Sequence, residues 1–232
     1  MPKISFTVSA RTARLIGREN VASSKGAIIE LVKNAYDADS IVSIVYFDNR
    51  YSVLLNELTK EQFAEITNRG ILEDDLAKAY SFSEDKYILK DDVDEQDLIQ
   101  LQKRLKDLSA LYIIDSGEGM TQNIIRNHWM TIGTDNKAYD VFTKSGRVKA
   151  GAKGIGRFAL DKLGTRCEMV TVFNPNNHEP DIDEKGEETS YRGYFWKVNW
   201  DDFEGDFKTI EKVEADLDGV MSESLLDAVR PL

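Results

Sequence analysis

The pattern of apolar and polar positions predicts helices and strands in mixed order. Apolar residues recur at helical spacing over 24–38, where Ser24 can cap the first turn. Further helices are predicted at 59–67, 71–80, 94–107, 121–131 and 155–163. Runs rich in Ile, Val and aromatic residues predict strands at 40–47, 111–114, 165–173 and 191–200, and a short strand at 3–8. Because helices and strands do not alternate regularly, we expect an α+β fold with two layers rather than a doubly wound sheet.

One stretch of the chain has a different composition from the rest. Residues 84–97 contain seven acidic residues and two lysines, which is typical of a solvated face or loop. It lies within 48–109, a mostly helical and acidic segment in which we identify no functional motif. We expect one domain over 1–232 that carries 48–109 as an insertion.

Charge and cysteine content exclude several classes of function. The formal net charge is −11, and a surface this acidic repels nucleic-acid phosphates, so no direct nucleic-acid binding is expected. Cys167 is the single cysteine, so no disulfide can form within the chain. The sequence has no signal-peptide core and no apolar run approaching the roughly 20 residues that span a bilayer. We therefore expect a cytoplasmic protein that does not contact membranes.

The predicted helix at 24–38 carries a polar motif. Glu30, Asn34 and Asp37 are spaced at i, i+4 and i+7, so they share one helix face. A carboxylate one turn from a carboxamide suits water activation and Mg²⁺ coordination, because Mg²⁺ takes few protein ligands when phosphates supply the others. The polar face of an ordinary surface helix would have the same pattern.

A second motif, Asp115-x-Gly117-x-Gly119, directly follows the predicted strand at 111–114. Its glycines allow a tight turn and a close approach of the backbone to a flat ligand. A buried Asp115 could accept a hydrogen bond from an exocyclic amine. A calcium-type acidic loop and a plain turn remain alternatives.

A third motif, Gly151-Ala152-Lys153-Gly154-Ile155-Gly156-Arg157-Phe158, opens the predicted helix at 155–163. Free N–H groups at such a helix start attract phosphate oxygens. Gly154-x-Gly156-x-x-Ala159 also matches the dinucleotide fingerprint, but no predicted strand precedes it as that motif requires. Six basic residues against Asp140 alone make the surrounding 137–157 locally positive: Lys137, Lys144, Arg147, Lys149, Lys153 and Arg157.

In this order and spacing, the three motifs resemble those of the GHKL ATPases, the superfamily of gyrase B, the ninety-kilodalton heat-shock chaperones, histidine kinases and MutL. Residues 30–39 resemble the N-box, 115–120 the first glycine motif and 151–158 the second. Gly133 and Thr134 resemble the start of the ATP lid, which would cover 133–153. The resemblance extends over roughly residues 1–200 and implies the Bergerat fold, with helices on one face of a mixed, mostly antiparallel sheet.

The resemblance also implies a role for each matching residue. Glu30 would be the general base that activates water, Asn34 would coordinate Mg²⁺, and Asp115 would bind the adenine amine. The other implied ATP contacts are Asp37, Gly117, Gly119, Met120, Gly133, Thr134, Lys137, Gly151, Lys153, Gly154, Ile155, Gly156 and Arg157.

These roles imply an Mg²⁺-dependent ATPase whose slow hydrolysis drives a conformational switch, as in the chaperone, gyrase B and MutL branch. We expect this chain to be the front part of a longer protein that dimerises with ATP and acts on a client not identified by the sequence. An ATP/ADP sensor with little hydrolysis is the alternative, and a kinase-type domain is a more distant one.

Overall fold

The computed structural model describes residue 5 and residues 7–19, 21–131, 141–150, 160–183 and 185–224. The chain forms two compact units. Unit 1 comprises Met1–Ile44 and Ile113–Leu232, and unit 2 comprises Val45–Tyr112. The described elements mix helices with antiparallel sheets, so the expected α+β class is confirmed.

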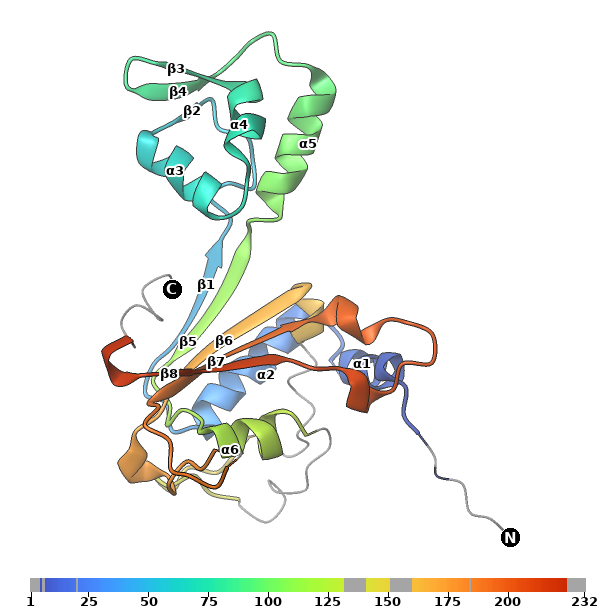
Figure 1. Cartoon of the computed structure of the whole chain (residues 1–232), viewed down its shortest axis with the longest axis vertical. Helices are drawn as coiled ribbons and strands as arrows, with labels where there is room; N and C mark the ends of the chain where they lie inside the picture. Colours follow the sequence, from blue (N-terminus) through green and yellow to red (C-terminus); the bar gives the residue numbers. More distant parts are fainter. Residues whose placement is uncertain are drawn as a thin grey trace. The chain divides into compact units, whose positions relative to one another are not determined.

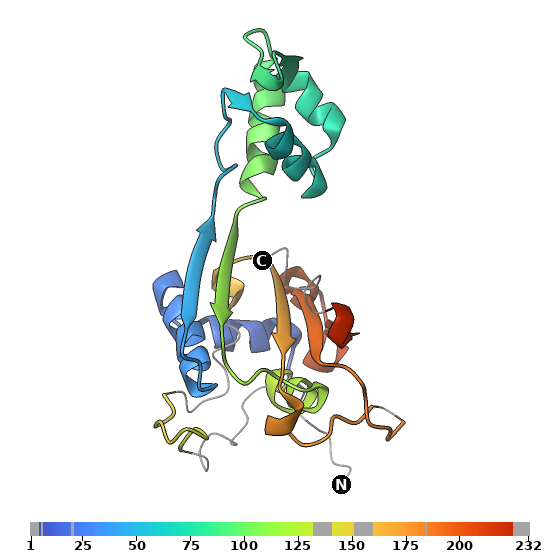
Figure 2. The ribbon, with the colours of Figure 1, turned by 90° about the vertical axis from the view of Figure 1, so that its left-hand side faces the viewer.

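Unit 1 contains an antiparallel sheet with strand order β6-β7-β8. Figures 1 and 2 show α1 and α2 beside this sheet. Its helices and strands are α1 (Ala10–Glu19), α2 (Ser24–Asp37), α6 (Gln122–Ile124), a π turn (Ile125–Trp129), β6 (Arg166–Val172), β7 (Gly193–Asn199) and β8 (Asp216–Val220). Short 3₁₀ turns occur at Pro175–Asn177, Trp200–Phe203, Ile210–Lys212 and Ser222–Ser224.

Two strands connect the units along the chain. β1 (Ser43–Asp48) leads from unit 1 into unit 2, and β5 (Ala110–Asp115) leads back. The two strands pair with each other and run in opposite directions (Figure 2).

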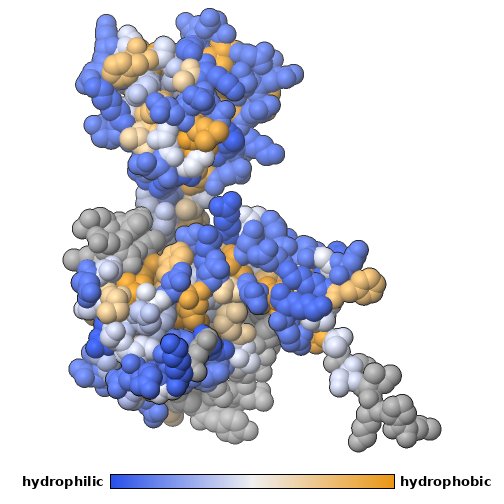
Figure 3. Space-filling model, in the orientation of Figure 1, coloured by the Kyte–Doolittle hydropathy of each residue, from blue (hydrophilic) through white to orange (hydrophobic). Residues whose placement is uncertain are grey.

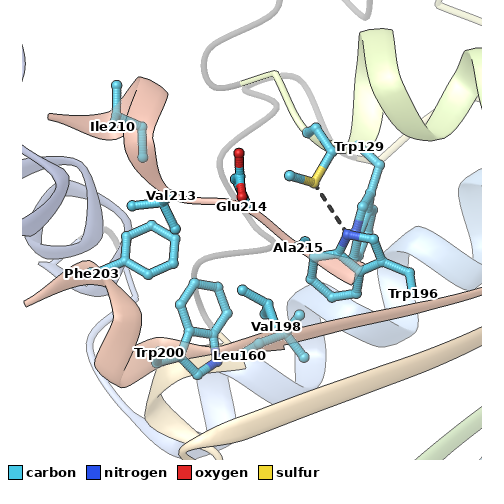
Figure 4. A pocket seen from close by; sticks show the side chains of 11 residues that line it. Trp129, Leu160, Trp196, Val198, Trp200, Phe203, Ile210, Val213, Glu214 and Ala215 are labelled. Carbon is cyan, nitrogen blue, oxygen red and sulfur yellow. Dashed lines mark hydrogen bonds between the residues drawn. The ribbon is translucent and has the colours of Figure 1, made fainter. Parts of the chain in front are cut away.

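The core of unit 1 lies against β7, where buried residues alternate with less buried ones as expected for a strand with one covered face. Tyr194, Trp196 and Val198 pack there with Trp200 and Phe203. A small apolar cavity of about 80 Å³ remains inside this cluster (Figure 4).

Helix α2 forms where the sequence predicts it, with two local differences. Ser23, not Ser24, is the N-cap, and its Oγ accepts a hydrogen bond from the Gly26 amide at 3.1 Å. The buried residues are Ala27, Leu31 and Ala35, whereas Ile28 is only half-buried. Small residues on this face allow close packing of the helix.

The N-terminal region differs from the prediction. Residues 7 and 8 are not in a strand; instead Ser9 forms an isolated bridge with Thr209, and α1 follows. Helix α1 is held by Arg14, whose guanidinium is 2.6 Å from Asp161 and also donates to the Trp200 carbonyl oxygen at 2.9 Å.

Unit 2 has its own three-stranded antiparallel sheet, ordered β2-β4-β3, and its own apolar core. Its elements are β2 (Glu57–Leu58), α3 (Lys60–Asn68), α4 (Glu73–Ala79), β3 (Tyr80–Ser83), β4 (Lys86–Leu89) and α5 (Glu95–Lys106). The predicted helices at 59–67, 71–80 and 94–107 are thus confirmed. Most residues of 84–97 are exposed, as expected for a solvated face, but the stretch is not one loop, because it contains β4 and the start of α5.

A buried carboxylate organises one side of unit 2. Asp48 is only 2% exposed and receives hydrogen bonds from Arg50, with Nε to Oδ1 at 3.0 Å, and from Arg69, with Nη2 to Oδ2 at 2.5 Å. These guanidinium groups hold the pKa of Asp48 well below its usual range. The outer surface of unit 2 on the face drawn in Figure 3 is mainly hydrophilic.

Candidate functional site

The polar residues of the first motif lie on α2. Glu30, Asn34 and Asp37 are all partly buried, and their spacing places them on one side of the helix. Glu30 Oε1 accepts a hydrogen bond from Lys33 Nζ at 2.8 Å. The helix therefore presents a carboxylate, a carboxamide and a second carboxylate in line, as the sequence predicts.

The second motif forms a turn that starts at the end of β5. Asp115 Oδ1 accepts a hydrogen bond from the Gly117 amide at 2.8 Å. The side chain of Asp115 is exposed, so the expectation of a buried aspartate was wrong. The strand ends at this residue, and the carboxylate folds over its own turn instead of entering the core.

The two glycines of this motif are required by close backbone approach. A Cβ on Gly117 would lie 2.8 Å from the Cβ of Ala38, at the end of α2. Gly119 has a φ of +72°, and a Cβ there would lie 1.9 Å from the carbonyl oxygen of Val172, at the end of β6. The 115–120 loop is thus wedged between α2 and β6.

Hydrogen bonds fix the loop in this position. The Glu118 amide donates to the Ala38 carbonyl oxygen at 3.0 Å, and the Met120 amide donates to Thr171 Oγ1 at 2.9 Å. The Ser116 amide donates to Ser40 Oγ at 2.9 Å. The first and second motifs are therefore joined directly.

Sequence reasoning missed several of the residues that make this junction. Ser40 and Ser116 connect the end of α2 to the loop, and His178 Nε2 lies 3.1 Å from the Glu118 carbonyl oxygen. Since a carbonyl oxygen only accepts, the proton is on Nε2. Ser40 and Ser116 stand within or beside the motifs, but a threonine in a strand, such as Thr171, gives no functional signal.

An open hollow of about 440 Å³ lies at the junction. It is lined by Ala38, Asp39, Ser116, Gly117, Glu118, Val172, Phe173, Asn174 and Asn177. Small-molecule sites usually measure about 300–1,000 Å³. The hollow falls in this range, whereas the apolar cavity of about 80 Å³ in Figure 4 does not.

The described part of the expected lid, 141–150, is a hairpin closed by an isolated bridge between Phe142 and Val148. Its last residue, Ala150, donates its amide hydrogen to Asp37 Oδ1 at 2.7 Å. Asp37 thus connects α2 with the segment that immediately precedes the third motif in the chain.

Many residues expected to contact ATP lie outside the described residues: Gly133, Thr134, Lys137, Gly151, Lys153, Gly154, Ile155, Gly156 and Arg157. Within the described ranges, no group of three or more His, Cys, Asp or Glu side chains is arranged to hold a metal ion. The expected magnesium site has Asn34 as its only proposed protein ligand.

Comparison of the sequence with models of known protein families gave no match, and comparison with curated protein sequences gave none. Among the described helices, none is both long and apolar enough to cross a membrane.

Proposed function

We propose that unit 1 binds Mg²⁺ and ATP and hydrolyses ATP slowly to drive a conformational switch, in the manner of the chaperone, gyrase B and MutL branch of the GHKL superfamily. The observation that carries this proposal is the direct docking of the 115–120 loop on the end of α2, through Glu118 and Ala38. This contact connects the loop that carries Asp115, the residue proposed to bind the adenine amine, to the helix that carries Glu30 and Asn34.

The chemistry assigned to these residues follows from their types. Asn34 supplies a neutral oxygen ligand for Mg²⁺, which itself neutralises charge on the phosphates. Glu30 accepts a proton from the attacking water, and Asp115 accepts a hydrogen bond from the adenine amine. A purely nucleotide-sensing protein would not need a base at Glu30. Dimerisation with ATP belongs to the same proposal and rests on the resemblance alone.

The first test concerns the preference of the site for adenine over guanine. Replacing Asp115 with Ala removes a charge-assisted hydrogen bond of about 1.5–3 kcal/mol, so calorimetric ATP affinity should fall by about 10- to 150-fold. GTP has a carbonyl where adenine has its amine, so it should bind the wild type poorly.

Asp183→Ala is a matched control for this test. Asp183 also accepts hydrogen bonds from its own turn, from the Lys185 amide at 2.8 Å and the Glu187 amide at 2.9 Å, and it belongs to none of the three motifs. ATP affinity should be unchanged in this variant. Equal affinity of the wild type for ATP and GTP would contradict the role of Asp115.

Turnover is the second test. Glu30→Gln should retain ATP affinity within a few-fold but lose about 10²–10⁴ in hydrolysis rate, the usual contribution of a general base. Phosphate release measured on the purified protein would check this. Equal turnover of the variant and an active wild type would exclude Glu30 as the base.

A further inference from the structure

The apolar cavity of about 80 Å³ in unit 1 has a wall rich in aromatic rings. Four aromatic side chains line it: Trp129, Trp196, Trp200 and Phe203. They include every tryptophan of the chain. The Trp129 and Trp196 rings meet at 87° with centroids 5.7 Å apart, and the Trp200 and Phe203 rings meet at 39° with centroids 5.1 Å apart. The cavity is therefore bordered by aromatic rings in several orientations.

A single carboxylate accompanies these rings. Glu214 is the one ionisable side chain among the described residues that line the cavity. In the view of Figure 4, its carboxylate lies between the indoles of Trp129 and Trp196 and the ring of Phe203. Glu214 is exposed, whereas Trp200 is only 2% exposed. The cavity thus extends from the protein surface, where the carboxylate stands, into the core.

The segment that supplies much of the wall is strongly acidic. Residues 201–218 contain eight acidic residues and two lysines, which is a formal net charge of −6 out of −11 for the whole chain. Exposed acids also directly follow two of the lining residues, with Glu211 after Ile210 and Asp216 after Ala215. A cation that approaches the cavity is therefore attracted, whereas an anion such as a phosphate is repelled.

The aromatic wall is ordered by packing and by a hydrogen bond. Trp196 Nε1 donates to Met130 Sδ at 3.2 Å, as the dashed line in Figure 4 shows. Trp196 and Trp200 are both buried. Because these rings are already held in place, a ligand would bind without the entropy cost of ordering them.

We propose that this cavity binds the trimethylammonium group of a quaternary ammonium ligand. The negative faces of several aromatic rings attract an alkylammonium cation, which is how choline and methylated lysine are recognised. Glu214 adds an opposite charge at the mouth. The size also fits, because an apolar cavity of about 150 Å³ holds the six carbons of benzene, and about 80 Å³ suits the four heavy atoms of this group.

Titration of the purified protein with choline chloride tests the site. Tryptophan fluorescence reports on it directly, because every tryptophan of the chain lines the cavity. Sodium chloride at the same ionic strength is the reference. We expect a saturable change with a Kd on the order of 1 mM, since one small buried group supplies the affinity.

The neutral carbon isostere of choline, 3,3-dimethyl-1-butanol, separates cation recognition from simple filling of an apolar space. It has the shape of choline without the charge, so it should bind about 2- to 30-fold more weakly, the usual range for cation–π attraction. No saturable response to choline would overturn the proposal. Equal or tighter binding of the isostere would overturn it as well.

Two matched variants test the carboxylate. Glu214→Gln keeps the shape of the side chain and removes its charge, so choline should bind about 2- to 5-fold more weakly, as for other exposed ion pairs. Glu211→Gln is the control, because Glu211 is also an exposed acid and lies three residues away. Its affinity for choline should be that of the wild type. Equal losses in the two variants would contradict the role of Glu214.

The aromatic wall is tested by Trp129→Leu, which removes a partly buried ring and keeps an apolar side chain. Choline should bind about 2- to 30-fold more weakly, while thermal unfolding of the same sample shows whether the variant is folded. Unchanged affinity in a folded variant would contradict the role of this ring. If the variant does not fold, the isostere and Glu214→Gln still decide the proposal.

A glycine pentapeptide with trimethyllysine at its centre distinguishes the two sources of such a group. Tighter binding of this peptide than of choline, with weak binding of the unmethylated peptide, would assign the ligand to a modified protein chain. Tighter binding of choline would assign it to a small molecule. Failure of both ligands to bind would overturn the proposal, and none of these outcomes depends on whether unit 1 binds ATP.

Discussion

Replacing Gly119 with Ala would test whether the 115–120 loop is as tightly wedged as the structure indicates. The added Cβ would lie 1.9 Å from the carbonyl oxygen of Val172 and 2.6 Å from its carbonyl carbon. Both atoms belong to the backbone, so they cannot rotate away as a side chain would. Either the loop or the end of β6 must move.

The cost of this substitution has two parts. A residue with a Cβ in the left-handed conformation costs about 1–2 kcal/mol relative to glycine. Overpacking against a fixed neighbour typically adds about 1–3 kcal/mol. Gly119→Ala should therefore lower the free energy of unfolding by about 2–5 kcal/mol, a large part of the roughly 5–15 kcal/mol that stabilises a typical domain.

A control in the same unit isolates the steric part. Gly186 has a φ of +84°, and nothing lies within 4 Å of the position that its Cβ would occupy. Gly186→Ala should cost only the conformational part, about 1–2 kcal/mol. The difference between the two variants therefore measures the contact with Val172.

Tryptophan fluorescence during thermal unfolding is a suitable assay, because all three tryptophans, Trp129, Trp196 and Trp200, belong to unit 1. For domains of about 150–250 residues, 1 kcal/mol corresponds to about 2–4 °C in Tm. Gly119→Ala should unfold about 2–12 °C below Gly186→Ala. Equal Tm values for the two variants would refute the close approach of the loop to β6.

Three other predictions concern titration and metal binding. The guanidinium partners of Asp48 lower its pKa. At pH values above the usual carboxyl pKa of about 4, Asp48 therefore stabilises unit 2. This contribution should disappear on acidification below that pH, as followed by hydrogen exchange of unit 2 peptides, and Asp48→Asn should remove about 1–3 kcal/mol at pH 7. Burial raises the pKa of the Cys167 thiol to about 12, so a disulfide reagent should react with it slowly at pH 8 in the native protein and rapidly in denaturant. Asn34→Ala should weaken calorimetric binding of ATP with Mg²⁺ more than binding of ADP without metal, and equal losses would indicate a structural role.

The spacing of apolar residues predicted much of the secondary structure. Helix α1 and the β3–β4 hairpin were not predicted, because their sequences lack a clear apolar periodicity. Helix α1 buries Ala10 and Ala13 and is held by the charged pair of Arg14 and Asp161, so its apolar stripe is inconspicuous. The β3–β4 hairpin turns at Glu84 and Asp85, which have φ values of 49° and 72°. Such turns usually contain glycine or asparagine, so these acidic residues instead suggested a loop.

The candidate site was only partly predictable for a related reason. The spacing of Glu30, Asn34 and Asp37 depends on one helix, and such local geometry can be derived from sequence. The contact between Asp39 and Ser145 joins residues 106 positions apart, so it depends on the tertiary fold. Local sequence likewise gave no indication that Asp115 would be exposed.

The paired strands β1 and β5 make unit 2 an exchangeable module. The chain leaves unit 1 on one strand and returns on its partner, and the rings of Tyr46 and Tyr112 stack with centroids 5.9 Å apart where the module begins and ends. In topological terms, unit 2 occupies the place of a hairpin turn. A short type I′ turn could replace it without requiring any other connection in unit 1 to change. A connection of this kind generally tolerates insertion or replacement of a whole module, because the rest of the chain keeps its own path.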